Sequence, residues 1–276
     1  MQKKILIIED LSSIGRTSLA TAIPIITAYG HESVAVPSAL LSANTAFKGF
    51  TYLDLTGEMV KILKHLNSLS YEADALYTGY LGSSRQVDII SNYLKDHPKL
   101  NYYLDPAFAD DGKLYDGFDQ AFVGEIKKLI AKAKLIMPNL TEAEMLLGVE
   151  AKANYLESDI LKLLKGLTSL GPKMAIITGV LADNNTIANY AYDRQSEKLY
   201  SYSYERLPNS YYGTGDIFAS LITGAMEANL SLDEALKLAG DFLYKAIEHS
   251  NLLNTNKLYG VCFEPYLSQL GGKAHE

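Results

Sequence analysis

Short apolar segments alternate with longer amphipathic segments along much of this 276-residue chain. The first of them, Ile5–Ile8, is apolar at every position, as is typical of a strand that is covered on both faces. Strands that alternate with helices favour a parallel sheet with helices on both sides. We therefore predict an α/β fold, a three-layer α/β/α sandwich with a mostly parallel central sheet.

The segments expected to form this fold follow one another in regular order. Strands are expected at Ile5–Ile8, Ser33–Val36, Ala75–Tyr80, Asn101–Leu104, Leu135–Met137 and Met174–Thr178. Helices are expected at Thr17–Tyr29, Gly57–Leu69, Arg85–Lys95, Phe122–Ala133, Ala143–Leu147 and Asp159–Leu170.

The pattern changes after Gly179. Thr186–Tyr192 and Lys198–Tyr204 alternate apolar and polar residues around a short polar turn, which predicts an antiparallel hairpin at the edge of the sheet. Two helices are expected to follow, Ile217–Ala228 and Leu232–Asn251, the second begun by a capping box of Ser231 and Glu234. No repeat, low-complexity segment or linker interrupts the sequence, so we expect a single domain over residues 1–276.

The composition is that of an ordinary globular protein, with 48% hydrophobic and 21% charged residues. A net charge of −7 argues against a surface for nucleic acid. The single cysteine, Cys262, excludes an intrachain disulfide and is expected to be a small buried side chain. The N-terminal apolar run is too short for a signal peptide and no stretch is long enough to span a bilayer, so we expect a cytoplasmic protein without a membrane partner.

Polar residues stand directly after most of the expected strands. Ligands of parallel α/β sheets collect beyond the carboxyl ends of the strands, so these residues are the candidates for a site. They are Glu9-Asp10, Thr78-Gly79-Tyr80, Asp105-Pro106, Asn139-Leu140-Thr141-Glu142 and Thr178-Gly179. We expect them to form one polar rim together with a glycine loop at residues 213–216.

That loop reads Gly213-Thr214-Gly215-Asp216 and precedes an apolar-periodic helix. Glycines let the backbone approach a ligand closely, and the free N–H groups at a helix start favour an anion such as a phosphate. Asp216 would then be a carboxylate beside the anion. The alternative from these residues alone is an ordinary helix start whose aspartate complements the helix dipole.

These groups suit phosphoryl transfer to an alcohol, which needs a base, donors around the phosphoryl group and a divalent cation. Asp216 is the base candidate, and Asn139 with Glu142 could serve a Mg²⁺ ion that is held mostly by water and phosphates. The alternative for Asn139 and Glu142 is a simple helix cap, and Asp110, Asp111 and Thr178 could equally be turn residues. There is no P-loop or dinucleotide-binding motif, and the five histidines show no metal-ligand spacing.

Taken in order, these motifs resemble the ribokinase-like superfamily, and within it the vitamin B6 kinases. The residues that carry the resemblance are Ser42-Ala43-Asn44-Thr45, Thr78-Gly79-Tyr80, Asp105-Pro106 with Asp110, Pro138-Asn139-Leu140-Thr141-Glu142-Ala143-Glu144, Ile177-Thr178-Gly179 and Gly213-Thr214-Gly215-Asp216.

The resemblance implies a ribokinase-like fold, usually a homodimer, that phosphorylates the 5′-hydroxymethyl group of a B6 vitamer with ATP, Mg²⁺ and a helpful K⁺. It assigns Asp216 as the base and the amides of Gly213, Thr214 and Gly215 as the anion hole. By the same resemblance Thr45 and Tyr80 contact the substrate ring. Three groups are assigned to the nucleotide and its metal ion: Asp105 and Asp110 lie near phosphates or cations, Glu142 orients Mg²⁺, and Asn139 and Thr178 touch the triphosphate. Tyr115 lies near the active site.

The segment after the first strand departs from the B6 kinase pattern. Where many B6 kinases have a serine that contacts the ring, Asp10 stands here, with Ser12 or Ser13 as alternatives for that contact. Hydroxymethylpyrimidine kinases of thiamine biosynthesis resemble this chain in carrying an aspartate in the corresponding segment, so they are the second hypothesis. A third is a non-catalytic protein that binds the vitamer on a kinase scaffold.

Overall fold

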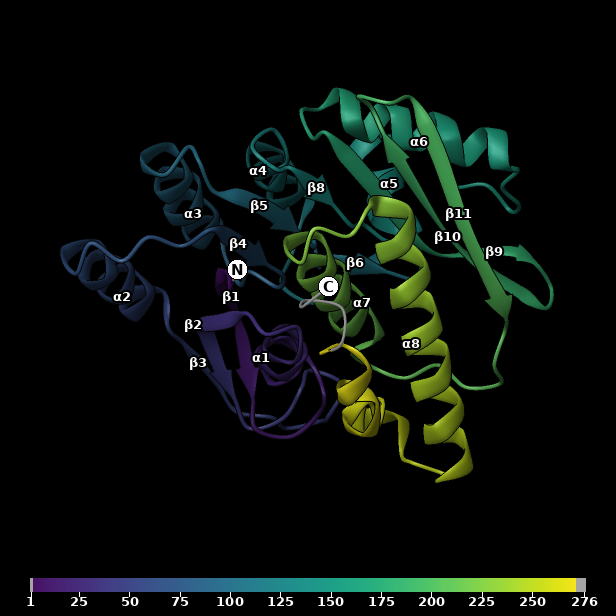
Figure 1. Ribbon diagram of the computed structural model, residues 1–276, viewed down its shortest axis with the longest axis horizontal. Helices are drawn as coiled ribbons and strands as arrows, with labels where there is room; N and C mark the ends of the chain where they lie inside the picture. The colour runs from purple at the N-terminus through teal and green to yellow at the C-terminus, as the bar shows by residue number, and fades with distance from the viewer. Residues whose placement is uncertain (1, 272–276) are drawn as a thin grey trace. The chain divides into compact units, whose positions relative to one another are not determined.

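The computed structural model describes residues 2–271, which fall into two compact units by their internal contacts. Unit 1 comprises Met1–Gly82 and Leu207–Glu276, and unit 2 comprises Ser83–Arg206. Each unit has its own strands and its own helices (Figure 1).

Unit 1 is built on three parallel strands and one short antiparallel strand. The strands are β1 (Lys4–Ser12), β2 (Glu32–Leu41), β3 (Tyr52–Asp54) and β4 (Ala75–Thr78), in the order β4-β1-β2-β3. The helices are α1 (Ser18–Ala28), α2 (Thr56–Ser68), α7 (Thr214–Glu227) and α8 (Leu232–Leu252), followed by the 3-10 turns η1 (Lys257–Tyr259) and η2 (Glu264–Gln269). Within this unit α1, α7 and α8 lie side by side (Figure 1).

Unit 2 contains three parallel strands that continue into an antiparallel meander. The strands are β5 (Asn101–Leu104), β8 (Leu135–Ile136), β9 (Met174–Asp183), β10 (Thr186–Asp193) and β11 (Lys198–Glu205), in that order. A small hairpin adds β6 (Ala109–Asp110) and β7 (Lys113–Leu114). The helices are α3 (Ser84–Asp96), α4 (Gln120–Ile130), α5 (Leu140–Leu147) and α6 (Glu157–Ser169).

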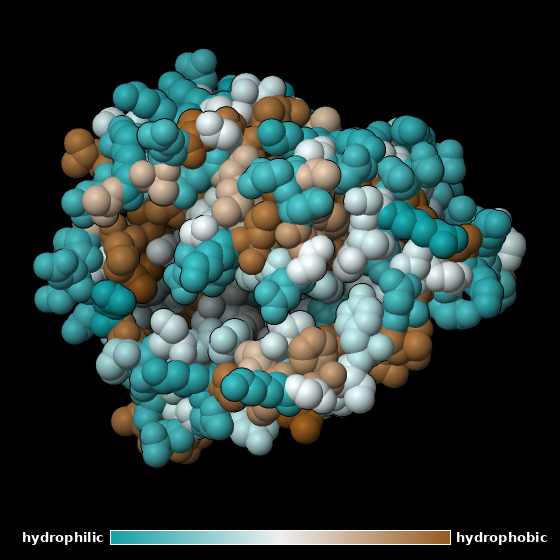
Figure 2. All heavy atoms as spheres, turned by 180° about the vertical axis from the view of Figure 1, so that it is seen from behind, coloured by the Kyte–Doolittle hydropathy of each residue, from teal (hydrophilic) through white to brown (hydrophobic). Residues whose placement is uncertain are grey.

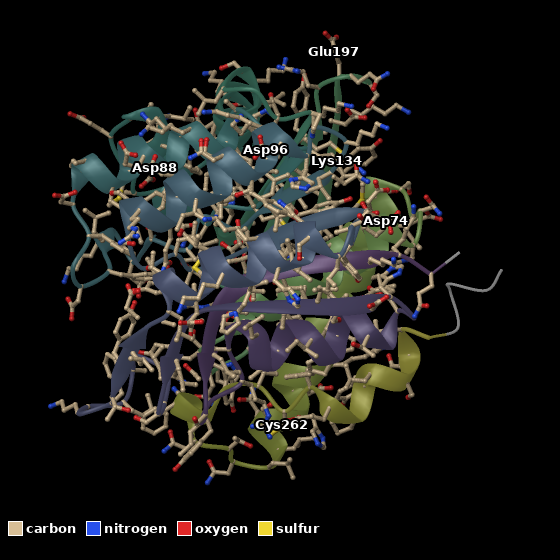
Figure 3. The ribbon with its side chains drawn as sticks, turned by 90° about the vertical axis from the view of Figure 1, so that its left-hand side faces the viewer. Asp74, Asp88, Asp96, Lys134, Glu197 and Cys262 are labelled. Atoms are coloured by element: carbon tan, nitrogen blue, oxygen red, sulfur yellow. The ribbon has the colours of Figure 1, made fainter. Side chains whose placement is uncertain are left out.

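The parallel strands form where the sequence is apolar without interruption. Ile5–Ile8 in β1 are buried on both faces, as their composition predicts. Asp74 ties the start of β4 to the start of β1, because its carboxylate accepts from Lys3 Nζ at 3.0 Å and from the Lys4 N–H at 2.9 Å (Figure 3 labels Asp74). The predicted capping box of α8 is present, with Ser231 accepting from the Glu234 N–H. The expected hairpin is also confirmed as β10 and β11.

The predicted ends of two strands that carry site residues need correction. β1 continues past Ile8 to Ser12 through an irregularity between Glu9 and Leu11, so Asp10 lies within the strand and not after it. β9 likewise continues past Thr178, because a bulge places Thr178 and Gly179 opposite the single residue Asn189. The short strands β3, β6 and β7 were not expected, since two or three residues show no alternation.

Apolar side chains lie mainly inside the units. Figure 2 shows one face of the protein, on which hydrophilic side chains predominate and hydrophobic ones emerge in separate groups. Cys262, labelled in Figure 3, is buried, as expected for a small apolar side chain. Among residues 2–271, the helices fall short of the length or the apolarity that crossing a bilayer requires.

The packing of α7 against the end of α1 depends on Gly224. A Cβ atom there would lie 2.3 Å from Cδ2 of Tyr29, a fully buried ring. We expect Gly224→Ala to lower the free energy of unfolding by roughly 1 to 3 kcal/mol, because the core must make room for the methyl group.

Urea denaturation measures this effect. Gly57→Ala is the matched control in the same unit, because a Cβ atom there meets no heavy atom within 4 Å. A helical alanine at an open position should be neutral or stabilise by up to about 1 kcal/mol. Equal destabilisation by both variants would contradict the packing argument.

Candidate active site

Unit 1 gathers four polar residues from three elements, which we call the Asp10 cluster: Asp10, Ser12, Ser18 and Asp216. Asp10 and Ser12 belong to β1, Ser18 begins α1 and Asp216 lies in the first turn of α7. The Asp10 carboxylate accepts from Ser18 Oγ at 2.6 Å and from Ser12 Oγ at 3.1 Å. Asp216 Oδ2 accepts from the Ser18 N–H at 2.8 Å. The structure therefore brings together Asp10, Ser12 and Asp216.

The glycine loop adopts the geometry that its sequence predicts. Gly213 has a left-handed conformation, with φ of 79°, and a Cβ atom at this position would lie only 2.0 Å from the carbonyl oxygen of Arg16. Within the described chain, no side chain caps α7 at Gly213. The first N–H groups of α7, at Thr214 and Gly215, are therefore placed to donate to an anion.

The pKa of the Asp216 carboxyl is raised toward neutral pH. Burial raises its pKa to about 6, the Ser18 N–H lowers it, and the negative charge of Asp10 raises it. Burial also raises the pKa of Asp10, while the hydroxyl groups of Ser18 and Ser12 lower it. A carboxylate with a pKa near the working pH is well suited to accept a proton from an alcohol.

The two predicted ring contacts, Tyr80 and Thr45, differ in their surroundings. Tyr80 is half-buried at the end of β4, and burial, with the charges of Tyr52 and Asp10, raises its pKa to about 12. Thr45 lies exposed in the loop after β2. Its neighbour Asn44 anchors that loop by donating from Nδ2 to the carbonyl oxygen of Leu258 at 2.9 Å.

Unit 2 gathers a second group around Glu142. This side chain is buried, and its Oε1 accepts from the N–H groups of Phe108 at 2.8 Å and Ala109 at 3.3 Å. Its Oε2 accepts from the Asn139 N–H at 3.0 Å. Burial, together with the charge of Asp110, raises the pKa of Glu142 to about 7, although these hydrogen bonds act to lower it.

Asn139 is the N-cap of α5 and forms the capping box with Glu142. Its Oδ1 accepts from the Glu142 N–H at 2.9 Å and its Nδ2 donates to the carbonyl oxygen of Ala109 at 2.7 Å. Thr178 pairs with Asn139 across an isolated parallel bridge. The helix-cap interpretation of Asn139 is therefore confirmed, while its contact with a triphosphate stays a prediction.

The remaining predicted residues of unit 2 surround the same loop. Asp105 is buried directly after β5, and Asp110 lies in β6 beside the tight turn of Asp111 and Gly112. Tyr115 is 40% exposed and its N–H donates to the carbonyl oxygen of Phe108 at 2.9 Å. Each unit thus carries part of the expected polar residues at the carboxyl ends of its own parallel strands, and the single rim stays a prediction.

Glu142 has the chemistry to serve a Mg²⁺ ion through water. Three N–H groups bind its two oxygens, and a carboxylate has about four acceptor positions, so one position is left for a further donor. Among residues 2–271 no group of three or more metal-ligating side chains gathers. A single carboxylate with one open acceptor position fits an ion held mostly by water and substrate phosphates.

Ser18 is a residue of the site that the sequence analysis missed. It stood inside the predicted helix Thr17–Tyr29, where a serine gives no signal of its own. The clue available was its place at the helix start, where Ser side chains make capping contacts.

An α/β fold with an uncapped, glycine-led helix start and a carboxylate in the first turn of that helix fits the class of ribokinase-like phosphotransferases. The family model described as phosphomethylpyrimidine kinase matches residues 20–261. The chain therefore belongs to this family of pyridoxal and phosphomethylpyrimidine kinases, and the resemblance drawn from its motifs is confirmed.

Solved structures share the fold over nearly the whole chain. A Bacteroides thetaiotaomicron protein, assigned as a phosphomethylpyrimidine kinase and crystallised with pyridoxal, is 39% identical with a TM-score of 0.93, covering 98% of this chain and 96% of that chain. The pyridoxal kinase of Lactobacillus plantarum is 30% identical with a TM-score of 0.90, covering 98% and 97%. The predicted fold class is therefore confirmed.

Curated relatives include kinases with both substrates. The pyridoxal kinase of Dictyostelium discoideum is 27% identical over 269 residues, which are 91% of this chain and 87% of the relative. The hydroxymethylpyrimidine/phosphomethylpyrimidine kinase of Aquifex aeolicus is 28% identical over 231 residues, which are 82% and 86%. Kinase chemistry is thus common to these relatives, while their acceptor molecules differ.

The raised pKa of Asp216 predicts a pH-dependent stability. A carboxyl whose pKa is higher in the folded state binds its proton more tightly when folded, so the folded state loses stability as the pH rises from about 4 through about 6. We expect Asp216→Asn to remove this loss. Relative to the wild type, the variant should gain roughly 1 to 3 kcal/mol between pH ~4.5 and pH ~8.

Urea denaturation across that pH range measures the gain. Asp233→Asn, an exposed aspartate in the first turn of α8, controls for the loss of an acidic residue at a helix start. A stability difference between Asp216→Asn and the wild type that does not vary with pH would show that burial does not perturb Asp216.

Proposed function

We propose that this protein catalyses ATP-dependent phosphorylation of the 5′-hydroxymethyl group of a vitamin B6 vitamer, pyridoxal, pyridoxamine or pyridoxine, in the salvage of pyridoxal phosphate. The observation that carries the proposal is Asp216, which lies at the uncapped start of α7 with a pKa of about 6. The pyridoxal in the 39% identical Bacteroides protein supports a vitamer as the acceptor.

In this proposal each residue of unit 1 has a defined task. Asp216 accepts the proton of the substrate hydroxyl, and the N–H groups of Gly213, Thr214 and Gly215 stabilise the charge on the transferring phosphoryl group. Asp10, Ser12, Thr45 and Tyr80 hold the ring of the vitamer.

Unit 2 carries the groups proposed for the nucleotide and the cation. Asp105, Asp110, Tyr115, Asn139 and Thr178 are assigned to ATP, and Glu142 to a water ligand of Mg²⁺, with K⁺ as a further cation. Mg²⁺ would supply charge neutralisation on the triphosphate when bound. Because the family match runs through both units, we propose that residues 1–276 form one kinase domain, which acts as a cytoplasmic homodimer.

The second candidate is hydroxymethylpyrimidine kinase, and Asp10 is the observation that favours it. An ionised carboxylate accepts hydrogen bonds and donates none, so Asp10 suits a substrate that presents an N–H group. The Aquifex relative supports the same candidate. A non-catalytic vitamer-binding protein is the least supported alternative, because binding alone does not require a proton-accepting carboxylate at the start of α7.

The first test compares acceptors. We expect the protein with MgATP to release ADP in the presence of a B6 vitamer, and Asp216→Asn to lower kcat by at least about 100-fold because the base is lost. A coupled ADP assay measures both, with Asp233→Asn as the control that keeps wild-type rates. Turnover of hydroxymethylpyrimidine alone would favour the second candidate, and binding of a vitamer without any turnover would favour the third.

The second test concerns Asp10. Its charge raises the pKa of Asp216, so Asp10→Ser should shift the acid limb of the kcat/KM profile for the vitamer to lower pH. We expect the variant to keep measurable vitamer phosphorylation with kcat/KM lowered by roughly ten- to a hundredfold, because a serine hydroxyl still offers one hydrogen bond to the ring. An unmoved acid limb would show that Asp10 does not influence the base.

A further inference from the structure

One residue, Ser18, connects the two carboxylates of the Asp10 cluster. Its hydroxyl donates to Asp10 Oδ1 at 2.6 Å and its N–H donates to Asp216 Oδ2 at 2.8 Å. Asp10 comes from β1 and Asp216 from α7, a separation of 198 positions between Ser18 and Asp216. Ser18 is itself buried, with 5% of its surface exposed. A single residue thus sets the relative position of two groups from distant parts of the chain.

The backbone of Ser18 has an unfavourable conformation. Its φ of 47° lies in the left-handed region, which residues with a Cβ atom rarely adopt. Among the described residues other than glycine that have a positive φ, Ser18 is the buried one. Such strain persists where the surroundings over-determine a residue, and it is concentrated at functional sites.

The start of α1 explains what holds this conformation. Thr17 occupies the N-cap position, but its side chain makes no capping hydrogen bond. The first N–H of the helix, that of Ser18, is instead bound by the Asp216 carboxylate. Asp216 therefore lies at two helix starts, its own in α7 and that of α1, and both favour its negative form.

The hydroxyl of Ser18 favours the ionised form of Asp10. Its hydrogen bond lowers the pKa of Asp10 against the effect of burial. Ser12 donates to the same carboxylate and also lowers its pKa, as does the backbone N–H of Asp10. Asp216, Tyr80 and Tyr52 are titratable neighbours of Asp10, and the charge of Asp10 raises the pKa of each of them.

We propose that Ser18 is a positioning residue of the reaction, whose N–H group orients the base Asp216 while its hydroxyl orients Asp10 toward the substrate. The inference rests on the function proposed above. It assigns Ser18 no contact with the reacting atoms: its effect passes through the two carboxylates.

Two substitutions separate this role from a structural one. Ser18→Ala removes the hydroxyl and keeps the strain, whereas Ser18→Gly removes the hydroxyl and relieves the strain. We expect both variants to lower kcat/KM for the vitamer by about tenfold or more, since a hydrogen bond to a charged group is lost. Ser18→Gly should be the more stable of the two and yet no more active.

Ser70 provides the matched control. It also has a left-handed backbone, with φ of 53°, but it is exposed in the turn after α2. Ser70→Ala and Ser70→Gly should repeat the difference in thermal stability and leave kcat and KM unchanged. Wild-type kinetics in Ser18→Gly would overturn the inference while leaving the proposed function intact.

A double-mutant cycle tests whether the effect passes through Asp10. In the Asp10→Ser background, Ser18→Ala should lower kcat/KM by less than about threefold, because its hydrogen-bonding partner is gone. A full tenfold loss in that background would show that the hydroxyl acts elsewhere.

A final measurement does not depend on turnover. Carboxyl ¹³C titration of the wild type and of Ser18→Ala reports the protonation of Asp10 directly. The Asp10 resonance should titrate at higher pH in the variant, because a donor to its ionised form is removed. An unmoved resonance would overturn the inference, whereas a wild type that phosphorylates neither candidate acceptor would overturn the proposed function alone.

Discussion

The approach of the α7 start to the loop after β1 is the contact on which the unit 1 site depends. Gly213 packs against the carbonyl oxygen of Arg16 at a distance that leaves no room for a Cβ atom. Farther along α7, Gly224 packs in the same way against the ring of Tyr29. These two close contacts hold α7 beside α1, and only in that position can Asp216 receive the N–H of Ser18. The hydrogen bond between Asp216 and Ser18 and the packing of α7 on α1 therefore both depend on glycine at positions 213 and 224.

Buried carboxylates serve different purposes in the two units. Glu142 binds three N–H groups of its own unit and thereby shapes the loop at Phe108 and Ala109. Asp216 binds one N–H group and keeps part of its surface open. A carboxylate surrounded by donors organises the backbone, whereas one with few donors remains available as a proton acceptor. Asp216 is for this reason a better candidate for the base than Glu142, although burial raises the pKa of both.

The sequence predicted the parts of the fold that depend on local pattern. β1, β5 and α8 appear where apolar runs, periodicity and a capping box indicate them. The extension of β1 through Asp10 could not be predicted, because pairing with β2 across an irregularity decides it and not the composition of the segment. The left-handed backbone of Ser18 is beyond prediction for the same reason, since a carboxylate far away in the chain stabilises it. Candidate residues could thus be named from motifs, but their hydrogen-bonding partners required the structure.

In the function proposed above, the charge of Asp10 has a consequence for the base Asp216. A negative charge close to Asp216 disfavours its ionised form, so the carboxylate accepts a proton more strongly but is ionised over a narrower range of pH. Burial raises the pKa of Asp10 itself, and the hydrogen bonds from Ser18 and Ser12 oppose part of that rise. A substrate that donates a hydrogen bond to Asp10 offsets part of that charge and thereby eases the ionisation of Asp216. In the proposed function, substrate binding and activation of the base would thus be coupled through a single carboxylate, a coupling that an uncharged serine could not provide.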